Sequence, residues 1–400
     1  MSTTLLDIAV IGAGPVGLAL ALQAARVLPH ARISVFDRRE LTHDASADPR
    51  TLALSLGSVQ LLQRLGSWPG AAAQPIREVH VSQLAPGLPT WAPMGAPEVH
   101  IRAADEGVPM LGAVLSYGAL LAPLQRAWLQ AEAAAPKRLA SRFGSVVRAL
   151  KPLADGVEVD AGIAERFDLA VVAEGGLFDQ QARKALARDY GQTAWVGTVT
   201  LRQATPGLAI ERFTRHGPVA LLPLPPRDAG AAHTEAALVW CVRRDDDPVR
   251  ELDAVQRQAV LATLLPEVAG RIERLSALKD FALGLNAERT LVDGRSVRIG
   301  NAAQTLHPVA GQGLNLGLRD AYELVQVLRH GAGVDAALRR VAWARGADRW
   351  ITIAATDFLA RSFTWQLPGL AAARGLGLAA LQTIAPLKSR LARQMMFGTR

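Results

Sequence analysis

The chain has 400 residues, half of them apolar and only 20% charged, which supplies a large hydrophobic core and excludes an intrinsically disordered protein. The net charge of +8 comes from scattered arginines without a basic block or a nucleic-acid-binding motif, so we expect no nucleic acid as a partner. The positive charge is compatible with two other kinds of partner, an anionic ligand such as a dinucleotide or an anionic lipid surface. The single cysteine, Cys241, excludes an internal disulfide and a CxxC metal or redox site.

The same sequence features predict the compartment. A lone cysteine fits a reducing compartment. No basic and apolar leader precedes the first strand, so we expect no secretory signal, and no run of eighteen uncharged apolar residues could span a bilayer. We therefore expect a cytoplasmic protein that is free or lies peripherally on the inner membrane.

The N-terminal residues predict a strand, a glycine-rich turn, a helix and a second strand. Residues 7–11 are typical of a buried parallel strand, and residues 16–27 of an Ala- and Leu-rich helix that Pro29 ends. Residues 33–36 form another β-branched apolar run. This order matches the βαβ unit that binds dinucleotides.

The middle of the chain predicts a second, largely antiparallel sheet. Alternating apolar residues in 76–102 indicate strands outside the first unit, and strand-like patterns recur through 193–241. Residues 146–159 predict a meander with its hairpin turn at Asp155 and Gly156.

The remaining segments alternate between helices and short strands. We expect helices at residues 117–135, at 252–275 and through nearly everything after Leu314, and strands at 167–173 and 297–299. No long flexible linker separates these segments, and a chain of this length suits two domains. The two domains must therefore interleave.

The first chemical signal is a GxGxxG formed by Gly12, Ala13, Gly14, Pro15, Val16 and Gly17. It lies directly after a buried strand and opens a helix, which is where the motif has physical meaning. Gly12 permits the tight turn, Gly14 lets the backbone approach a pyrophosphate, and Gly17 lets the helix pack on the sheet. The helix N-terminus adds amide donors and the positive end of its dipole. The motif indicates a dinucleotide but does not distinguish FAD from NAD.

An acidic residue follows at the position that the dinucleotide fold requires. Asp37 ends the second strand, 25 residues beyond Gly12, where a carboxylate can accept hydrogen bonds from the adenosine ribose hydroxyls. We count Arg38, the next residue, among the candidate cofactor-binding residues.

A second glycine-rich turn lies far along the chain. A strand runs straight into Gly300, and a helix starts near Leu314. Amide groups between them can face an anionic or carbonyl-rich ligand. The candidate cofactor-binding residues here are Asn301, Gly311, Gln312, Gly313, Leu314 and Asn315. Two glycine-rich helix N-termini suit one long cofactor, and we predict FAD.

These motifs resemble those of the class A flavoprotein aromatic hydroxylases and, within that family, the ubiquinone-biosynthesis hydroxylases. The segment from Gly300 to Gly317 is similar to the family's GDAAHxxHPxxGQGxNxGxxDA signature, which Asp320 and Ala321 complete. Arg50 with the Ala-Leu-Ser that shortly follows it resembles the family's post-strand segment, whose arginine meets the flavin.

Other parts of the chain extend the resemblance. Residues 211–213 and 217–223 are similar to the family's substrate-domain strands, and the likeness weakens after about Arg345. The form Gly-Asn-Ala-Ala-Gln at 300–304 resembles the branch that hydroxylates a 2-polyprenyl-6-methoxyphenol.

The resemblance implies an α/β fold like that of p-hydroxybenzoate hydroxylase. A Rossmann-like FAD-binding domain would be interleaved with an antiparallel β-sheet substrate domain and followed by C-terminal helices. The corresponding segments are 1–75, 105–180 and 280–330 for the FAD-binding domain, 76–104 and 181–279 for the substrate domain, and 331–400 for the C-terminal helical region.

The resemblance also implies a reaction and roles for particular residues. The expected reaction inserts one oxygen atom from O2 into a polyprenylated phenol, with NADPH as reductant and a flavin C4a-hydroperoxide as the oxygen donor. Asn301 would hydrogen-bond the ribityl chain, residues 311–315 would face the flavin pyrimidine ring, and Pro308 would lie at its reacting face. Because the cofactor carries the chemistry, no catalytic triad or metal cluster is needed.

One segment departs from the family pattern. Residues 173–176 read Ala-Glu-Gly-Gly where the family carries ADGxxS followed by VR, so Glu174 replaces the aspartate, and Arg183 lies about two positions too far along. In the family that motif contributes to the binding of both FAD and NADPH, so the departure implies that this chain recognises NADPH differently.

His307, with Pro308 a candidate catalytic residue, has two interpretations. As the family's HP histidine it would position the ring or the substrate; alternatively it caps the turn before Pro308. It has no second His, Asp or Glu at ligand spacing, so we predict no metal site there.

The C-terminal residues 370–396 combine an apolar stripe with four basic side chains, Arg374, Lys388, Arg390 and Arg393. Such a helix can lie on an anionic membrane surface, or it can pack on its own protein with a solvated basic face. A polyprenyl substrate would favour the membrane interpretation.

Two other functions stay open from sequence. One is hydroxylation of a small soluble aromatic compound, which polar residues around a closed pocket would favour. The other is a flavin-binding assembly subunit of a membrane-associated ubiquinone-biosynthesis complex.

Overall fold

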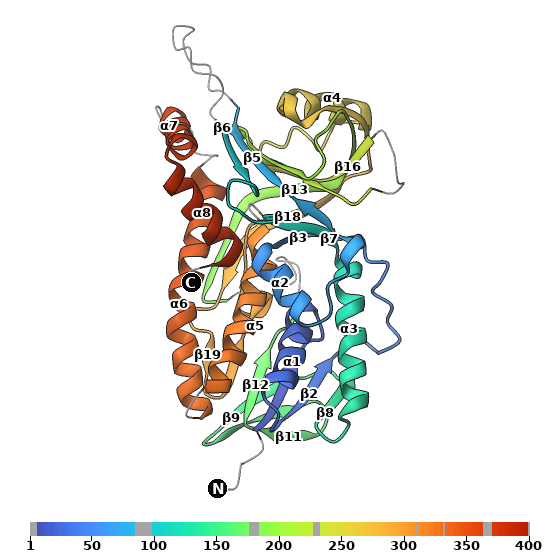
Figure 1. Ribbon diagram of the computed structural model, residues 1–400, viewed down its shortest axis with the longest axis vertical. Helices are drawn as coiled ribbons and strands as arrows, with labels where there is room; N and C mark the ends of the chain where they lie inside the picture. The colour runs from blue at the N-terminus through green and yellow to red at the C-terminus, as the bar shows by residue number, and fades with distance from the viewer. Residues whose placement is uncertain are drawn as a thin grey trace.

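The computed structural model describes residues 6–84, 98–175, 184–226, 233–308, 311–330, 333–362 and 370–398, without the side chains of 370–372. Two large sheets organise these residues, one toward each end of the molecule (Figure 1). The predicted α/β fold class is confirmed.

The six-stranded sheet has the order β19-β20-β12-β1-β2-β8 and is parallel except for the β19–β20 pair. Its strands are β1 (Leu6–Ile11), β2 (Ala31–Asp37), β8 (Leu139–Phe143), β12 (Leu169–Val172), β19 (Val292–Asp293) and β20 (Ser296–Arg298). The helices α1 (Pro15–Val27), α3 (Tyr117–Ala134) and α5 (Gln312–His330) share one hydrophobic core with it. The antiparallel meander of β9 (Ala149–Leu153), β10 (Gly156–Asp160) and β11 (Ala164–Phe167) packs on it through a second core.

The nine-stranded sheet has the order β21-β18-β13-β16-β15-β14-β5-β6, with β17 also paired to β13. Its strands are β5 (Glu78–Gln83), β6 (Glu98–Arg102), β13 (Leu186–Arg202), β14 (Leu208–Phe213), β15 (Pro218–Pro223), β16 (His233–Arg243), β17 (Arg271–Leu275), β18 (Lys279–Ala287) and β21 (Gln304–Thr305). Only β14 and β5 pair in parallel. Helix α4 (Ala254–Leu264), capped by Asp253, covers one face of the sheet (Figure 1).

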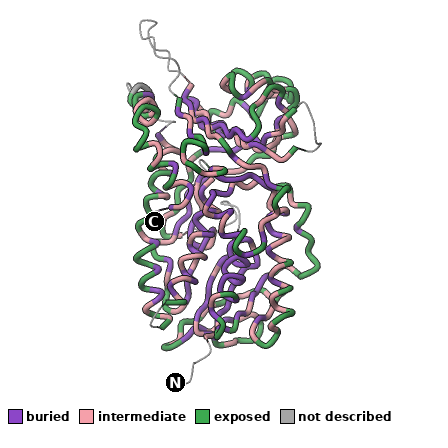
Figure 2. The backbone as a smooth tube through the Cα atoms, in the orientation of Figure 1, coloured by how far each residue is buried: buried purple, intermediate pink, exposed green. Residues whose placement is uncertain are grey.

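Smaller elements join the two sheets. A three-stranded sheet has the order β3-β7-β4, from β3 (Thr51–Ser55), β4 (Gln74–Ile76) and β7 (Gly112–Ser116). Helix α2 (Leu56–Arg64) continues directly from β3, and the 3-10 turns are Gly70–Ala72, Glu267–Ala269 and Gly300–Ala302. Figure 2 shows the buried stretches concentrated in the sheets and in α1.

The last three helices are α6 (Val334–Ser362), α7 (Leu370–Thr383) and α8 (Ala385–Phe397). A buried ionic network fixes α6 to α5, because Arg345 on α6 donates to Asp320 on α5 at 2.8 Å and to Asp348 at 2.6 Å. The sequence predicted one helix over residues 370–396, but the structure has two, α7 and α8, in this segment. Pro386 opens α8, and the chain leaves helical geometry at Ile384.

Two other predictions are wrong in part. Residues 252–275 are not helical throughout, since Gly270 has a φ of +78° and β17 then pairs with β13. Strands β18 and β21, which fall in the predicted FAD-binding segment 280–330, pair within the nine-stranded sheet.

Candidate functional site

The turn between β1 and α1 requires glycine at two positions. Gly12 has a φ of +107°, and a Cβ atom there would lie 2.9 Å from the backbone of Ala173 and Glu174. A Cβ on Gly17 would lie 1.9 Å from the carbonyl oxygen of Gly12. The chain itself therefore demands these two glycines, because β12 and α1 pack directly on the turn.

Gly14 differs from its neighbours. Its backbone is extended, with a φ of −77°, and a Cβ there would meet only the hydroxyl of Tyr117, at 3.8 Å. Gly14 is also the N-cap of α1 and provides no side-chain cap, so no capping side chain occupies the space beside the first amide groups of the helix. That space fits an anionic group such as the pyrophosphate of a dinucleotide.

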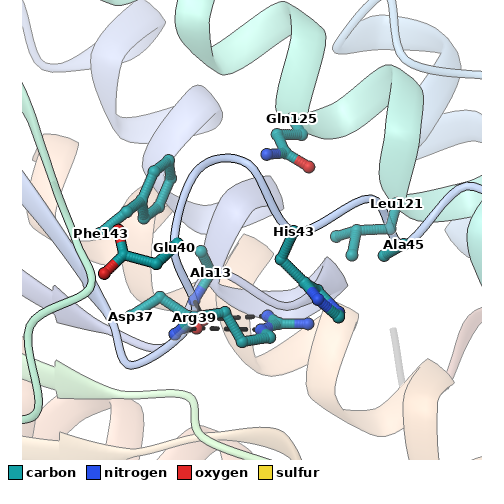
Figure 3. Close-up of a pocket in the computed structure, with 9 residues that line it drawn as sticks. All are labelled: Ala13, Asp37, Arg39, Glu40, His43, Ala45, Leu121, Gln125 and Phe143. Atoms are coloured by element: carbon teal, nitrogen blue, oxygen red, sulfur yellow. Dashed lines mark hydrogen bonds and ion pairs between the residues drawn. The ribbon is translucent and has the colours of Figure 1, made fainter.

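Asp37 lies where β2 ends, beside the turn. Its carboxylate accepts a hydrogen bond from the Ala13 backbone N–H at 2.7 Å and two from the Arg39 guanidinium at 2.9 Å each (Figure 3). Burial would raise the pKa of Asp37, but these hydrogen bonds outweigh it and hold the pKa below its ordinary value. Asp37 is therefore an ionised acceptor beside the first turn, as its predicted role toward the adenosine ribose requires.

Arg39, two residues beyond Asp37, is the arginine that contacts the Asp37 carboxylate. Arg39 lines the pocket beside Asp37, whereas the Arg38 side chain is exposed and acts electrostatically on Glu174. Strand β2 ends at Asp37, so Arg39 reaches back to Asp37 from the bend that follows the strand.

Arg50 also reaches the first turn. Its guanidinium carbon lies 4.2 Å from the ring centroid of Tyr117, and it forms a bidentate ion pair with Asp48. Since a Cβ at Gly14 would meet the Tyr117 hydroxyl, the contact with Tyr117 places Arg50 near the first turn; its contact with the flavin stays a prediction.

The second glycine-rich turn packs against the first. A Cβ on Gly317 would lie 2.7 Å from the Cα of Gly300 and 2.9 Å from the Val16 side chain, and Gly300 itself has a φ of +58°. The end of β20, the first turns of α5 and the first turn of α1 therefore meet at one point. This brings both predicted cofactor-binding segments to a single site.

Asn315 holds α5 to β3. Its Oδ1 accepts from the Ser55 backbone N–H and the Ser58 hydroxyl, both at 2.8 Å, and its Nδ2 donates to the carbonyls of Ala53 and Gly311. These bonds use the full capacity of the amide, so Asn315 fixes the turn that would face the flavin. At Gly313, two residues earlier, a Cβ atom would meet no described atom within 4 Å outside the helix's own backbone.

A cavity of about 320 Å³ adjoins this second turn. Pro308, Gly311, Gln312 and Asn315 form the wall on the side of the turn. The rest is lined mainly by apolar side chains of the nine-stranded sheet and of α6, α7 and α8, including Val79, Val81, Val99, Ile101, Phe213, Leu222, Val239, Leu359, Leu378, Leu381, Leu391 and Met396. The cavity can therefore hold an apolar ligand next to the expected flavin ring.

Known proteins match the chain over nearly its whole length. A family model described as FAD binding domain matches residues 191–337. The ubiquinone hydroxylase UbiL of Rhodospirillum rubrum is 31% identical over 98% of this chain and 89% of its own. The 3-demethoxyubiquinol 3-hydroxylase of Escherichia coli is 31% identical over 96% of each chain.

The chain belongs to the family of FAD-dependent ubiquinone-biosynthesis hydroxylases. This confirms the family resemblance and the FAD predicted from the paired glycine turns. A solved structure of HpxO from Klebsiella pneumoniae, in complex with FAD and uric acid, superposes with a TM-score of 0.67 at 18% identity, covering 98% of this chain and 96% of that one. Its likeness shows the fold of these hydroxylases.

In this hydroxylase, His307 does not line the cavity although Pro308 does. Its Nε2 lies 2.9 Å from Gln192 Oε1, and its ring stacks edge-on against Tyr190. Burial lowers the pKa of His307 to about 3, so the ring stays neutral at physiological pH. The geometry supports a structural role behind the Pro308 turn rather than contact with substrate.

Glu174, at the departure from the family motif, lies near Asp37 and Arg38. Burial raises its pKa, Arg38 opposes the shift, and Asp37 adds to it. Gly176 and Arg183 of the same motif lie outside the described residues.

One histidine and glutamate group lies away from this site. On β5 and β6, His80 lies 3.0 Å and His100 3.6 Å from Glu98, while His100 Nδ1 lies 2.7 Å from Glu78. Cross-strand ion pairs account for this proximity.

The Gly14→Val substitution tests the first turn. We expect the melting temperature of the apoprotein to stay unchanged, because the structure leaves room for the side chain. FAD affinity should fall at least about 100-fold, because the valine would occupy the space of the pyrophosphate. Flavin fluorescence titration and thermal melting measure the two effects. Gly17→Ala is the control, because its Cβ would collide with backbone and should lower the melting temperature of the apoprotein itself. Unchanged FAD affinity in the Gly14→Val protein would contradict the assignment.

Proposed function

We propose that the protein hydroxylates a polyprenylated phenol in ubiquinone biosynthesis, with NADPH as reductant and O2 as the oxygen source. The observation that carries the proposal is the apolar cavity beside the second glycine-rich turn. The names of the two relatives, a ubiquinone hydroxylase and a 3-demethoxyubiquinol 3-hydroxylase, support the substrate class.

FAD, when bound, supplies the oxygen-transfer chemistry. The chain's own residues would supply the surroundings. Gly14 and the N-terminus of α1 would hold the pyrophosphate, Asp37 the ribose, and Gly311 with Gly313 the ring. Pro308 would close the reacting face, and the apolar walls would exclude water from it.

The lining of the cavity favours a long-chain phenol over a small soluble aromatic. Polar residues in a closed pocket would suit the second class, but here the wall is predominantly apolar, and Leu391 both lines the cavity and is 37% exposed. A prenyl tail would leave the cavity past Leu391 on α8.

A direct assay tests the proposed function. The purified, FAD-loaded protein should oxidise NADPH when given a farnesylated methoxyphenol and should insert one atom of ¹⁸O from ¹⁸O2 into the product, as measured by mass spectrometry. Oxidation of NADPH with no ¹⁸O in any phenol tested would contradict a hydroxylase. No NADPH oxidation with any phenol would favour the assembly-subunit alternative.

We further propose that the protein meets its substrate at an anionic membrane surface through the α7–α8 junction. No helix among the described residues is long and apolar enough to cross a membrane. Around the junction, Leu376, Ile384 and Leu387 are 61%, 49% and 46% exposed. Each nearby cation would contribute about 1 kcal/mol of attraction to an anionic surface.

The two exposed leucines allow a matched test. Burying a leucine in lipid contributes about 1.5–3 kcal/mol, so Leu376→Asp with Leu387→Asp should lower affinity for anionic liposomes at least about tenfold. Turnover of a short-chain phenol in detergent should persist. Val255→Asp, at a site on α4 that is 78% exposed, is the control and should leave liposome binding unchanged. Equal liposome binding by all three proteins, measured by cosedimentation, would refute the membrane role.

A further inference from the structure

Glu211 is the one acidic or basic side chain that lines the cavity among the described residues. It lies on β14, where alternation turns Ala209, Glu211 and Phe213 toward the cavity. Its partners across the sheet are Val81 on β5 and Ala220 on β15, which also line the cavity and are apolar. A carboxyl group is thus inserted into an otherwise apolar wall.

No hydrogen bond or ion pair to Glu211 occurs in the part of the chain that the structure describes. Arg212, the next residue, points to the other face of the sheet and donates to Ser82 at 3.0 Å. An unpaired carboxyl in an apolar wall is unfavourable for folding, and the fold alone gives no reason for it. A polar ligand group in the cavity would give one.

We propose that Glu211 is a catalytic residue that binds the phenolic hydroxyl of the substrate and accepts its proton. This inference rests on the proposed function. The phenol O–H bond breaks, the proton moves to a carboxylate oxygen of Glu211, and the electron pair stays on the ring oxygen, which makes the ring more nucleophilic. After hydroxylation, Glu211 returns the proton to that oxygen, and the proton on the hydroxylated carbon leaves to water as the ring regains aromaticity.

The buried surroundings of Glu211 determine the pKa of its carboxyl group. Burial raises the pKa of Glu211 to about 8, which is near the pH at which a general base is most effective. The Cys241 thiol on β16 is the titratable group that faces Glu211. Burial raises the pKa of this thiol well above its ordinary value, so the thiol stays neutral. The cavity-lining residues of α6, α7 and α8 carry no ionisable group. The base form of Glu211 therefore exists above about pH 8 and is lost as the pH falls below it.

The Glu211→Gln substitution keeps the shape and removes the base. We expect kcat/KM for the farnesylated methoxyphenol to fall about 10²–10⁴-fold, with FAD affinity and NADPH-driven flavin reduction unchanged. The wild-type rate should rise with pH, be half-maximal near pH 8 and level off above it, and the variant should lack this step. A nitro-substituted phenol that is already ionised at the assay pH should restore the variant to within about tenfold of wild type. Glu158→Gln, on β10, is the control and should behave as wild type.

Two outcomes would overturn the role. One is a variant with the wild-type rate and pH profile; the other is an equal loss on both phenols, which would indicate a packing effect.

A binding measurement separates this inference from the proposed function. Binding is measured without NADPH, so that no turnover occurs. The affinity of the wild-type protein for the methoxyphenol should increase above about pH 8. Neither the Glu211→Gln protein with the methoxyphenol nor the wild-type protein with the O-methylated ligand should show that increase. If wild type shows the pH-dependent binding but hydroxylates no phenol, the proposed function fails and the Glu211 contact stands. If wild type hydroxylates the phenol but binds it without pH dependence, the role of Glu211 fails alone.

Discussion

The site depends on the close contact between three segments that are far apart in the sequence. Gly300 at the end of β20 and Gly317 in α5 both lie against Val16 in the first turn of α1, at separations that leave no room for a Cβ at Gly317. Because protein interiors are closely packed, this contact fixes the position of α5 relative to the dinucleotide turn. It brings two separate glycine-rich segments together, as our proposal of one FAD that spans both requires.

Other interactions hold α5 in that position. Asn315 ties its first turn to β3 through four hydrogen bonds, and Arg345 ties it to α6 through Asp320. The nine-stranded sheet then presents an alternating face to α5, with the opposite face buried under α4. On the face toward α5 the strands carry mainly apolar side chains and Glu211, so the sheet contributes both the apolar wall and the one acidic side chain among the described residues that line the cavity.

The sequence predicted the features that depend on local spacing. The GxGxxG turn, Asp37 and the second motif were identifiable because turns and helix starts impose their residue types over a few positions. Features that depend on tertiary contacts were missed. Arg39 contacts Asp37 from the bend after β2, and His307 is buried against Gln192, a residue more than a hundred positions away. The sequence pattern could not show that Glu211 faces a cavity, or that α7 and α8 close it.

The central claim is that one FAD spans both glycine-rich turns and presents its ring to the apolar cavity. A crystal structure of the protein with FAD and a farnesylated methoxyphenol tests it most directly. The account predicts the pyrophosphate at Gly14, the flavin ring beside Gly311 and Gly313, and the phenol ring between Pro308 and Glu211 with its tail directed toward α7 and α8. Density for FAD at only one of the two turns, or for the phenol outside the cavity, would contradict it.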